Sequence, residues 1–192
     1  LTLIGTGAID GTGNTGANTL LGNGAANRLD GAAGVDSVSG AGGNDTLVFD
    51  LQDALLDGGA DSDTLLVDGA GRNLGIAALN AVRDVEVLDV RGSGANELIL
   101  GVDDALALAG AGKALRVRAD ANERVTLHGG WTAQADVVVD SVTYRHFTAA
   151  NGADLLVEQG AALTVNGIVP LGALDGGDGF RLRGVLASEG LG

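Results

Sequence analysis

The sequence predicts an all-β protein: a parallel β-roll or β-solenoid, continued by a solenoid of short strands and ending in an antiparallel β cap. Glycine supplies 34 of the 192 residues, more than twice its usual share of ~7%. A nine-residue repeat fills the first third of the chain, and aromatic residues make up only 3%. A core built from Leu, Val, Ile and Ala suits thin, stacked strands better than one bulky globular core. Collagen is excluded, because there is no Gly-x-y period and Pro170 is the single proline.

The charge distribution indicates cations as partners. The net charge is -14, and residues 1–68 carry ten Asp against one Arg, so this third of the chain holds -9 of it. Nucleic acids and anionic membranes require clustered Lys and Arg, so we expect neither as a partner. We expect no membrane insertion either, because no apolar run of ~18 residues occurs. Cysteine is absent, which excludes disulfides and thiolate metal sites.

The repeat has a strict nine-residue frame. It begins at Gly13 and reads GNTGANTLL, GNGAANRLD, GAAGVDSVS and GAGGNDTLV without a gap. After a degenerate unit, FDLQDALLD at 49–57, it returns in phase as GGADSDTLL at 58–66. The eighth position is aliphatic throughout, and the first is glycine except in the degenerate unit. Glycine-rich halves permit tight turns and the other halves form very short strands, so two units make one coil of 18 residues.

The coil predicts stacked polar side chains at the sixth position. Asn18 should lie over Asp36 on one edge, and Asn27, Asp45 and Asp63 should form a row on the other. Carboxylates stacked at the ~4.8 Å strand spacing repel each other. A hard cation between turns removes this repulsion, and Ca²⁺ prefers such oxygen-rich surroundings. Carbonyl oxygens of the glycine turns complete the expected donors, with candidates at Gly31, Gly40, Gly42 and Gly58. The alternative is a metal-free solenoid in which Asp and Asn side chains bridge the turns by hydrogen bonds.

This nonapeptide resembles that of the RTX family, GGxGxDxUx, which forms a calcium-bound parallel β-roll. The resemblance covers residues 13–66, and GAGGNDTLV at 40–48 is the best-matching unit. It implies Asp36, Asp45 and Asp63 as side-chain calcium ligands, with Asn18 and Asn27 as neutral oxygen donors in the same position. The chain also departs from the motif: Ala32 and Ala41 replace the second glycine, and Ala54 occupies the sixth position of the degenerate unit. We therefore expect about two or three calcium ions.

Short strands are expected to continue beyond the repeats, at 85–90, 97–102, 114–119 and 124–129. Two segments have helical character, 73–82 with Asn73 as a candidate cap and 103–110 with Gly110 beyond its end. Alternating segments at 136–147 and 154–165, joined across Asn-Gly at 151–152, predict an antiparallel cap that closes the solenoid. Trp131, Tyr144 and Phe147 would supply its bulk. We expect three parts: a calcium-binding β-roll at 1–68, a solenoid and cap at 69–167, and a linker at 168–192.

Looser resemblances suggest a function. The segment from 129 is similar to regions that follow RTX repeats in large secreted bacterial adhesins. The tail at 170–192 resembles the linker and opening strand of an integrin-like FG-GAP repeat, so we expect the chain to be an internal piece of a longer protein. These resemblances imply a calcium-dependent spacer of a secreted or cell-surface protein, exported by type I secretion, with possible extracellular partners bound by other domains. The alternative is a calcium-dependent folding or secretion domain of a hydrolase such as a metalloprotease or lipase.

Enzyme signals have simpler explanations. Gly11, Gly13 and Gly16 satisfy GxGxxG, but they lead into the repeat and not into a helix. AGAGKAL at 109–115 resembles a phosphate loop but lacks its first Gly and its Ser or Thr. His128 and His146 are candidates for a metal or acid–base pair with Asp136 or Asp140, although lone histidines on strands are more often surface or packed residues. No HExxH or GxSxG motif occurs. We expect no catalytic activity.

Overall fold

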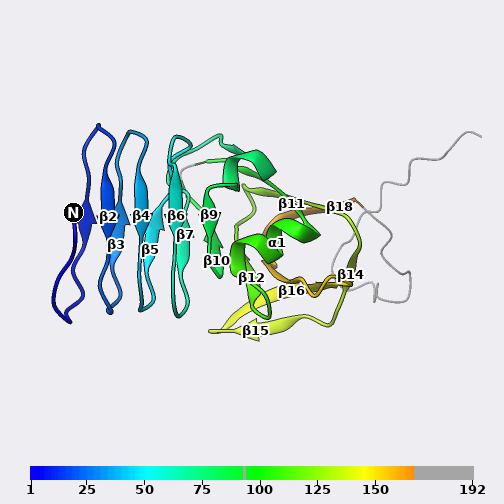
Figure 1. Cartoon of the computed structure of the whole chain (residues 1–192). Helices are drawn as coiled ribbons and strands as arrows, with labels where there is room; N and C mark the ends of the chain where they lie inside the picture. Colours follow the sequence, from blue (N-terminus) through cyan, green and yellow to red (C-terminus); the bar gives the residue numbers. More distant parts are fainter. Residues whose placement is uncertain (93, 167–192) are drawn as a thin grey trace, which may run out of the picture.

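The chain forms a stack of β-coils followed by a broader β-rich end (Figure 1). The structure, a computed structural model, describes residues 1–92 and 94–166. The linker and FG-GAP-like tail expected at 168–192 lie outside these described residues. Within them, three sheets account for the named strands, so the all-β prediction is confirmed.

The longest sheet runs through both the repeats and the region that follows them. Its ten strands are parallel from β1 to β17 and antiparallel beyond that point. In spatial order they are β1 (Gly11–Thr12), β3 (Arg28–Asp30), β5 (Thr46–Val48), β7 (Thr64–Leu66), β10 (Val87–Asp89), β12 (Ala114–Arg118), β17 (Asp154–Glu158), β16 (Val142–Ala149) and β14 (Trp131–Ala133), with β15 (Val137–Val139) also paired to β16.

Two four-stranded parallel sheets form the opposite walls of the coils. The first, beside the repeats, contains β2 (Thr19–Leu21), β4 (Ser37–Ser39), β6 (Leu55–Asp57) and β9 (Val82–Arg83). The second contains β8 (Asn73–Leu74), β11 (Glu97–Gly101), β13 (Arg124–His128) and β18 (Ala162–Asn166).

The register of the repeat strands follows the nine-residue frame. Leu29 pairs with Leu47, and Leu47 with Leu65, so residues 18 apart lie on neighbouring strands. All three side chains are fully buried. Successive side chains of a strand point to opposite faces of the sheet. The aliphatic residue at the eighth position of each unit therefore points into the space between the two walls. The predicted coil of two units is therefore confirmed.

Beyond the repeats the coils become wider. Strands β11, β12 and β13 have five residues each, against three in β3 to β7. Each of the four strands expected between 85 and 129 is present as β10, β11, β12 or β13. Leu98, Leu115 and Val125 are fully buried between the walls, so the solenoid continues where the nonapeptide has faded.

One helical segment was predicted correctly and one was not. The segment at 103–110 forms α1 (Val102–Ala109), with Gly110 as its C-cap at φ 82°. In 73–82, however, Asn73 belongs to strand β8 and is not a helix cap, and the only helical turn is the 3-10 helix η1 (Ile76–Leu79). Pairing of Asn73 with Glu97 of β11 overrides the local helical pattern. None of the described helices is long and apolar enough to cross a membrane.

An antiparallel cap closes the long sheet. β16 pairs with β17 across the turn at 151–152, as the sequence predicts, and also with β14 and β15. Trp131 and Phe147 are buried in the common core, and Tyr144 is buried as well. β18 departs from the prediction, because it leaves the cap and pairs in parallel with β13.

Candidate calcium sites

The sixth-position side chains lie at the corners of the coils, directly before the short strands. Asp36, Asp45 and Asp63 are at most 1% exposed, and Asn27 is 4% exposed. Asn18 is half-buried. Their place is fixed by parallel pairing of the strands that follow, β2 with β4 and β3 with β5 and β7. The sequence thus brings carboxylates into the interior of each turn.

One oxygen of each Asp joins neighbouring coils. The backbone N–H of Asn18 donates to Asp36 Oδ1 at 2.7 Å, and that of Asn27 donates to Asp45 Oδ1 at 2.7 Å. The N–H of Asp45 donates to Asp63 Oδ1 at 2.8 Å. These bonds each span 18 residues, and they place Asn18 next to Asp36 and the other three residues in one row, as the repeat predicts.

The other oxygen of each Asp is buried and differs from the first in its contacts. Asp36 Oδ2, Asp45 Oδ2 and Asp63 Oδ2 are buried and accept no hydrogen bond within the described part of the chain. A buried carboxylate oxygen without a partner is costly, and a bound cation is one way to satisfy it. The donor set therefore fits a hard, oxygen-preferring cation such as Ca²⁺.

First-position glycines bring carbonyl oxygens close to the same carboxylates. A Cβ atom on Gly40 would collide with both Asp45 Oδ2 and the carbonyl oxygen of Gly58. On Gly58 it would lie 2.7 Å from Asp63 Oδ2 and would also collide with the carbonyl oxygen of Asp84. At each of these glycines a carboxylate oxygen and a carbonyl oxygen lie next to the position that a Cβ atom would occupy. A carboxylate of one coil and a carbonyl of the next are therefore neighbours. Among the described residues, no group of three or more His, Cys, Asp or Glu side chains is placed to hold a metal ion, so a site at these corners would also need carbonyl oxygens.

The other predicted glycine donors differ in their surroundings. A Cβ on Gly31 would lie 2.5 Å from Asp36 Oδ2, whereas a Cβ on Gly42 would meet no atom within 4 Å. Gly42 is therefore not required by close packing. Its N–H donates to the carbonyl of Asn23 on the neighbouring coil at 3.3 Å.

The Asp-containing turns share a left-handed backbone. At the second position Ala32, Ala41 and Gly59 have φ of 65°, 77° and 103°. The fourth positions of the same turns also have positive φ, at Gly34, Gly43 and Asp61. Alanine and aspartate are strained in this region, so the turn geometry is retained where the motif's glycines are missing.

The Asn-containing turns are closed by their own hydrogen bonds. Asn18 Oδ1 accepts from the N–H of Asn14 at 2.6 Å, and Asn27 Oδ1 accepts from the N–H of Asn23 at 2.9 Å. Asn14 and Asn23 in turn accept from the N–H two residues on, at 2.9 Å in both turns. No second- or fourth-position residue of these turns has positive φ. Hydrogen bonds of the kind considered in the metal-free alternative are thus present in these two turns, and each amide oxygen accepts one of them.

Burial raises the pKa of the Asp63 and Asp45 carboxyl groups. Desolvation raises the pKa of Asp63 from 3.8 to about 7, opposed by the hydrogen bond from the Asp45 N–H and reinforced by the charges of Asp45 and Glu86. It raises the pKa of Asp45 to about 6, again opposed by a backbone hydrogen bond and reinforced by the charge of Asp61. A cation beside these groups acts in the opposite direction, because it favours the ionised form.

The sequence did not indicate two further carboxylates at these corners, Asp53 and Glu86. Asp53 has a buried Oδ1 without a partner in the described residues, and burial raises its pKa to about 6. Glu86 Oε2 accepts from the N–H of Asp63 at 2.8 Å, and Glu86 Oε1 accepts from Lys113. Asp53 is in the fifth position of the degenerate unit, and Glu86 follows Asp63 by 23 residues. Neither obeys the 18-residue spacing by which the others were found.

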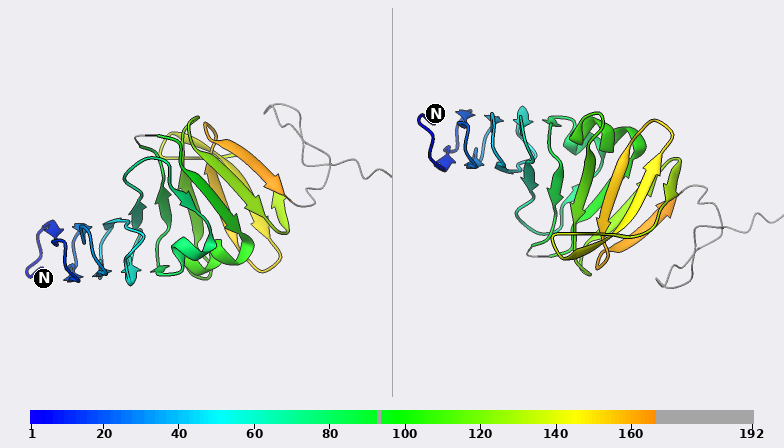
Figure 2. Two further views of the ribbon diagram at one scale, coloured as in Figure 1. Left: turned by 90° about the horizontal axis from the view of Figure 1, so that it is seen from above. Right: turned by 90° about the horizontal axis from the view of Figure 1, so that it is seen from below.

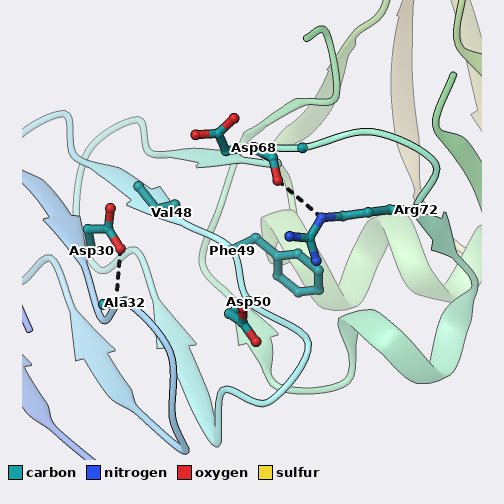
Figure 3. A pocket seen from close by; sticks show the side chains of 8 residues that line it. Asp30, Ala32, Val48, Phe49, Asp50, Asp68 and Arg72 are labelled. Atoms are coloured by element: carbon teal, nitrogen blue, oxygen red, sulfur yellow. Dashed lines mark hydrogen bonds between the residues drawn. The ribbon is translucent and has the colours of Figure 1, made fainter. Parts of the chain in front are cut away.

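A separate cavity lies at the ends of the repeat strands (Figure 3). Its volume is about 230 Å³, and it is lined by Asp30, Phe49, Asp50, Asp68 and Arg72 among others. Arg72 Nε donates to the carbonyl of Asp68 at 3.1 Å, and Asp30 Oδ1 accepts from the Ala32 N–H at 2.9 Å. Phe49 replaces the first-position glycine of the degenerate unit and is buried. These hydrogen bonds lie within the turns at the ends of the repeat strands.

The two histidines lie on different sheets and do not form a pair with Asp136 or Asp140. His146 on β16 contacts Asp154 on β17, with Nε2 2.9 Å from Oδ1. His128 is exposed at the end of β13. This arrangement agrees with the expectation that lone histidines on strands are surface or packed residues.

Comparison with known families finds a match for the first four repeat units. Residues 12–47 match the family model of the RTX calcium-binding nonapeptide repeat in four copies. This stretch is an array of RTX repeats. The RTX family binds calcium, which is the ion that the donor set favours. No curated protein matches the chain.

One solved structure with some similarity is the solution structure of the AlgE6R3 subunit from the Azotobacter vinelandii mannuronan C5-epimerase. It shares 21% sequence identity with this chain, and the alignment covers 94% of this chain and 91% of the other with a TM-score of 0.26.

Proposed function

We propose that this chain is a calcium-dependent structural module, a stiff spacer within a secreted or cell-surface bacterial protein. The observation that carries the proposal is the set of three buried carboxylate oxygens, at Asp36, Asp45 and Asp63, that have no partner among the described residues. Asp36 and Asp45 lie within the stretch that matches the RTX repeat model. These three side chains, with carbonyl oxygens of the glycine turns, are the proposed calcium ligands. Asn18 and Asn27, whose amide oxygens already accept hydrogen bonds, serve the metal-free turns.

Calcium would act on folding through charge. Residues 1–68 carry ten Asp and one Arg, so in the absence of cations the compact coil brings like charges together. An ion that binds the coil and not the unfolded chain supplies positive charge and adds stability by linkage. The bound ion supplies charge neutralisation and cross-bridging of coils, and no redox or acid–base chemistry is needed.

The proposed place of folding is outside the cell. RTX repeats occur in secreted proteins, and calcium modules of extracellular proteins are typically tuned to dissociation constants near 10⁻⁴–10⁻³ M. Sites built from single carboxylates and carbonyls suit that weak range, because ligand charge is low. The module would then remain unfolded during export and fold on reaching calcium.

The stack of coils supports the spacer role. Figures 1 and 2 show the coils in one row from the N-terminus to the end that contains α1. Each coil adds length, and parallel backbone hydrogen bonds join it to the next. Such quasi-one-dimensional stacks resist bending as long as each interface is intact.

The test is a calcium titration of the full chain against EGTA, followed by circular dichroism. The triple variant Asp36→Asn, Asp45→Asn and Asp63→Asn should lose the calcium-induced gain in β signal and melting temperature. The matched control is Asp68→Asn, Asp103→Asn and Asp140→Asn, which removes the same charge from exposed positions and should keep the response. Identical melting of the wild type in calcium and EGTA would overturn the proposal.

A further inference from the structure

The row of corner carboxylates continues beyond the repeats. Asp45, Asp63 and Glu86 precede the strands β5, β7 and β10, which are neighbours in the long sheet. Each uses one oxygen to accept a backbone N–H from the preceding coil: Asn27 to Asp45 at 2.7 Å, Asp45 to Asp63 at 2.8 Å, and Asp63 to Glu86 at 2.8 Å. Glu86 is therefore the third carboxylate of one ladder, although no repeat unit contains it.

The second oxygen distinguishes Glu86 from the two aspartates. Asp45 Oδ2 and Asp63 Oδ2 are buried without a partner in the described residues. Glu86 Oε1 instead receives the ammonium group of Lys113, which directly precedes β12, at 2.5 Å. Glu86 is 7% exposed. Within residues 1–92 and 94–166, no cationic group lies beside the second oxygen of Asp45 or Asp63, whereas that of Glu86 has the ammonium group of Lys113.

Lys113 is the only lysine of the chain. It lies in the segment 109–115 that resembles a phosphate loop, but its ammonium group donates a hydrogen bond to Glu86. Desolvation raises the pKa of Asp63, and the neighbouring charge of Lys113 opposes part of this rise, so the ammonium group acts on the last aspartate of the row as well. The Arg83–Asp57 contact is different, because Arg83 is exposed and lies on β9 of another sheet.

We propose that Lys113 is a built-in cation that ends the calcium row: beside Glu86 it takes the role that calcium takes beside Asp45 and Asp63. The proposal rests on the proposed calcium-binding function. The junction of β10 with β12 is then held without metal, and the number of calcium sites on this edge is limited by a side chain of the chain itself.

Replacing the ammonium group of Lys113 tests whether it stands in for calcium beside Glu86. In Lys113→Met the second oxygen of Glu86 loses its partner and becomes equivalent to those of Asp45 and Asp63. Isothermal titration of the calcium-free full chain should then show one more bound ion than in the wild type. The melting temperature of the variant should fall in EGTA and recover toward the wild-type value in calcium.

Three further variants define the outcome. Lys113→Arg keeps the cation and should keep the wild-type number of ions, and Glu86→Gln with Lys113→Met should return to that number. Arg83→Met removes an equal charge from a pair outside the row and should leave the number unchanged. The assignment is overturned if Lys113→Met binds no additional ion while the wild type binds calcium, or if it fails to fold even in calcium. A wild type that binds no calcium overturns the proposed function and this assignment together.

Discussion

At the residue scale, the period predicted the positions of Asp36, Asp45 and Asp63, because an 18-residue coil stacks equivalent side chains. It did not predict how their two oxygens differ, since that depends on which backbone N–H groups point toward them. Asp53 and Glu86 were missed for a related reason. Asp53 is in the fifth position of its unit and not the sixth, and Glu86 follows Asp63 by 23 residues and not by 18, so the nine-residue frame does not include them. Only the folded coil brings these carboxylates to the same edges.

Strain at Ala41 yields a stability prediction. Ala41 is exposed with φ 77°, and a left-handed alanine costs about 1 kcal/mol or more. Ala41→Gly should therefore stabilise the calcium-loaded protein by about 0.5–1 kcal/mol. Ala17→Gly is the control, because Ala17 is exposed without positive φ, and it should destabilise. Urea unfolding in calcium measures both, and a loss of stability in Ala41→Gly would contradict the turn geometry.

The raised pKa values predict how calcium-free stability depends on pH. The folded-state pKa of Asp63 is about 7 and that of Asp45 about 6, against 3.8 ordinarily. Between about pH 4 and 7 the folded protein holds more protons than the unfolded chain, so stability falls as pH rises through this window. Melting in EGTA should therefore occur at a higher temperature at pH 5 than at pH 8.

The variant Asp63→Asn isolates this effect. It removes the group with the highest of these pKa values, so the difference between its melting temperatures at pH 5 and pH 8 should be smaller than in the wild type. An unchanged difference would mean that Asp63 does not titrate in the window. In calcium, protons and the cation compete for the same carboxylates, so calcium affinity should weaken as pH falls below about 7.

At the element scale, two kinds of turn share one sequence frame. The frame predicted where every turn begins, but the hydrogen bonds of Asn14 and Asn23 show why the first two units have asparagine: each side chain closes its own turn. Element type was predicted well where apolar alternation is long, as in β11 to β13. It was wrong at 73–74, because pairing with β11 is a tertiary effect that outweighs local helical preference.

The difference between the turns should appear in calcium dependence. Asn27 is 4% exposed; it accepts from the Asn23 N–H and donates to the Ile9 carbonyl at 2.8 Å. Asn27→Ala should therefore cost about 1–3 kcal/mol, equally in calcium and in EGTA. Asp45→Asn should reduce stability mainly in calcium. Chemical denaturation of both variants in both buffers makes the comparison, and a calcium-specific loss in Asn27→Ala would show that this turn also binds the ion.

At the scale of the whole molecule, the two ends differ in what holds them together. Residues 1–68 have strands of two or three residues and one basic side chain against ten acidic ones, whereas residues 69–166 have eight basic against twelve acidic ones. The second part also has longer strands and the Lys113–Glu86 pair. The sequence predicted the roll and the cap, but not that one sheet would run through both, since parallel pairing between β7 and β10 has no local signal.

This asymmetry predicts that calcium removal unfolds the chain from its N-terminal end. In EGTA, hydrogen exchange should become fast for the strand amides of Leu29, Leu47 and Leu65, because repulsion among the Asp rows opposes their coils. Amides of Val125 and Val157 should remain protected, since wider strands and internal charge pairs hold those coils without metal. Small-angle scattering should accordingly show an elongated particle in calcium and a compact domain with a flexible extension in EGTA. Uniform loss of protection along the whole chain would mean that the cap depends on calcium as much as the roll does, and unchanged exchange at Leu47 would mean that the ion does not stabilise the roll.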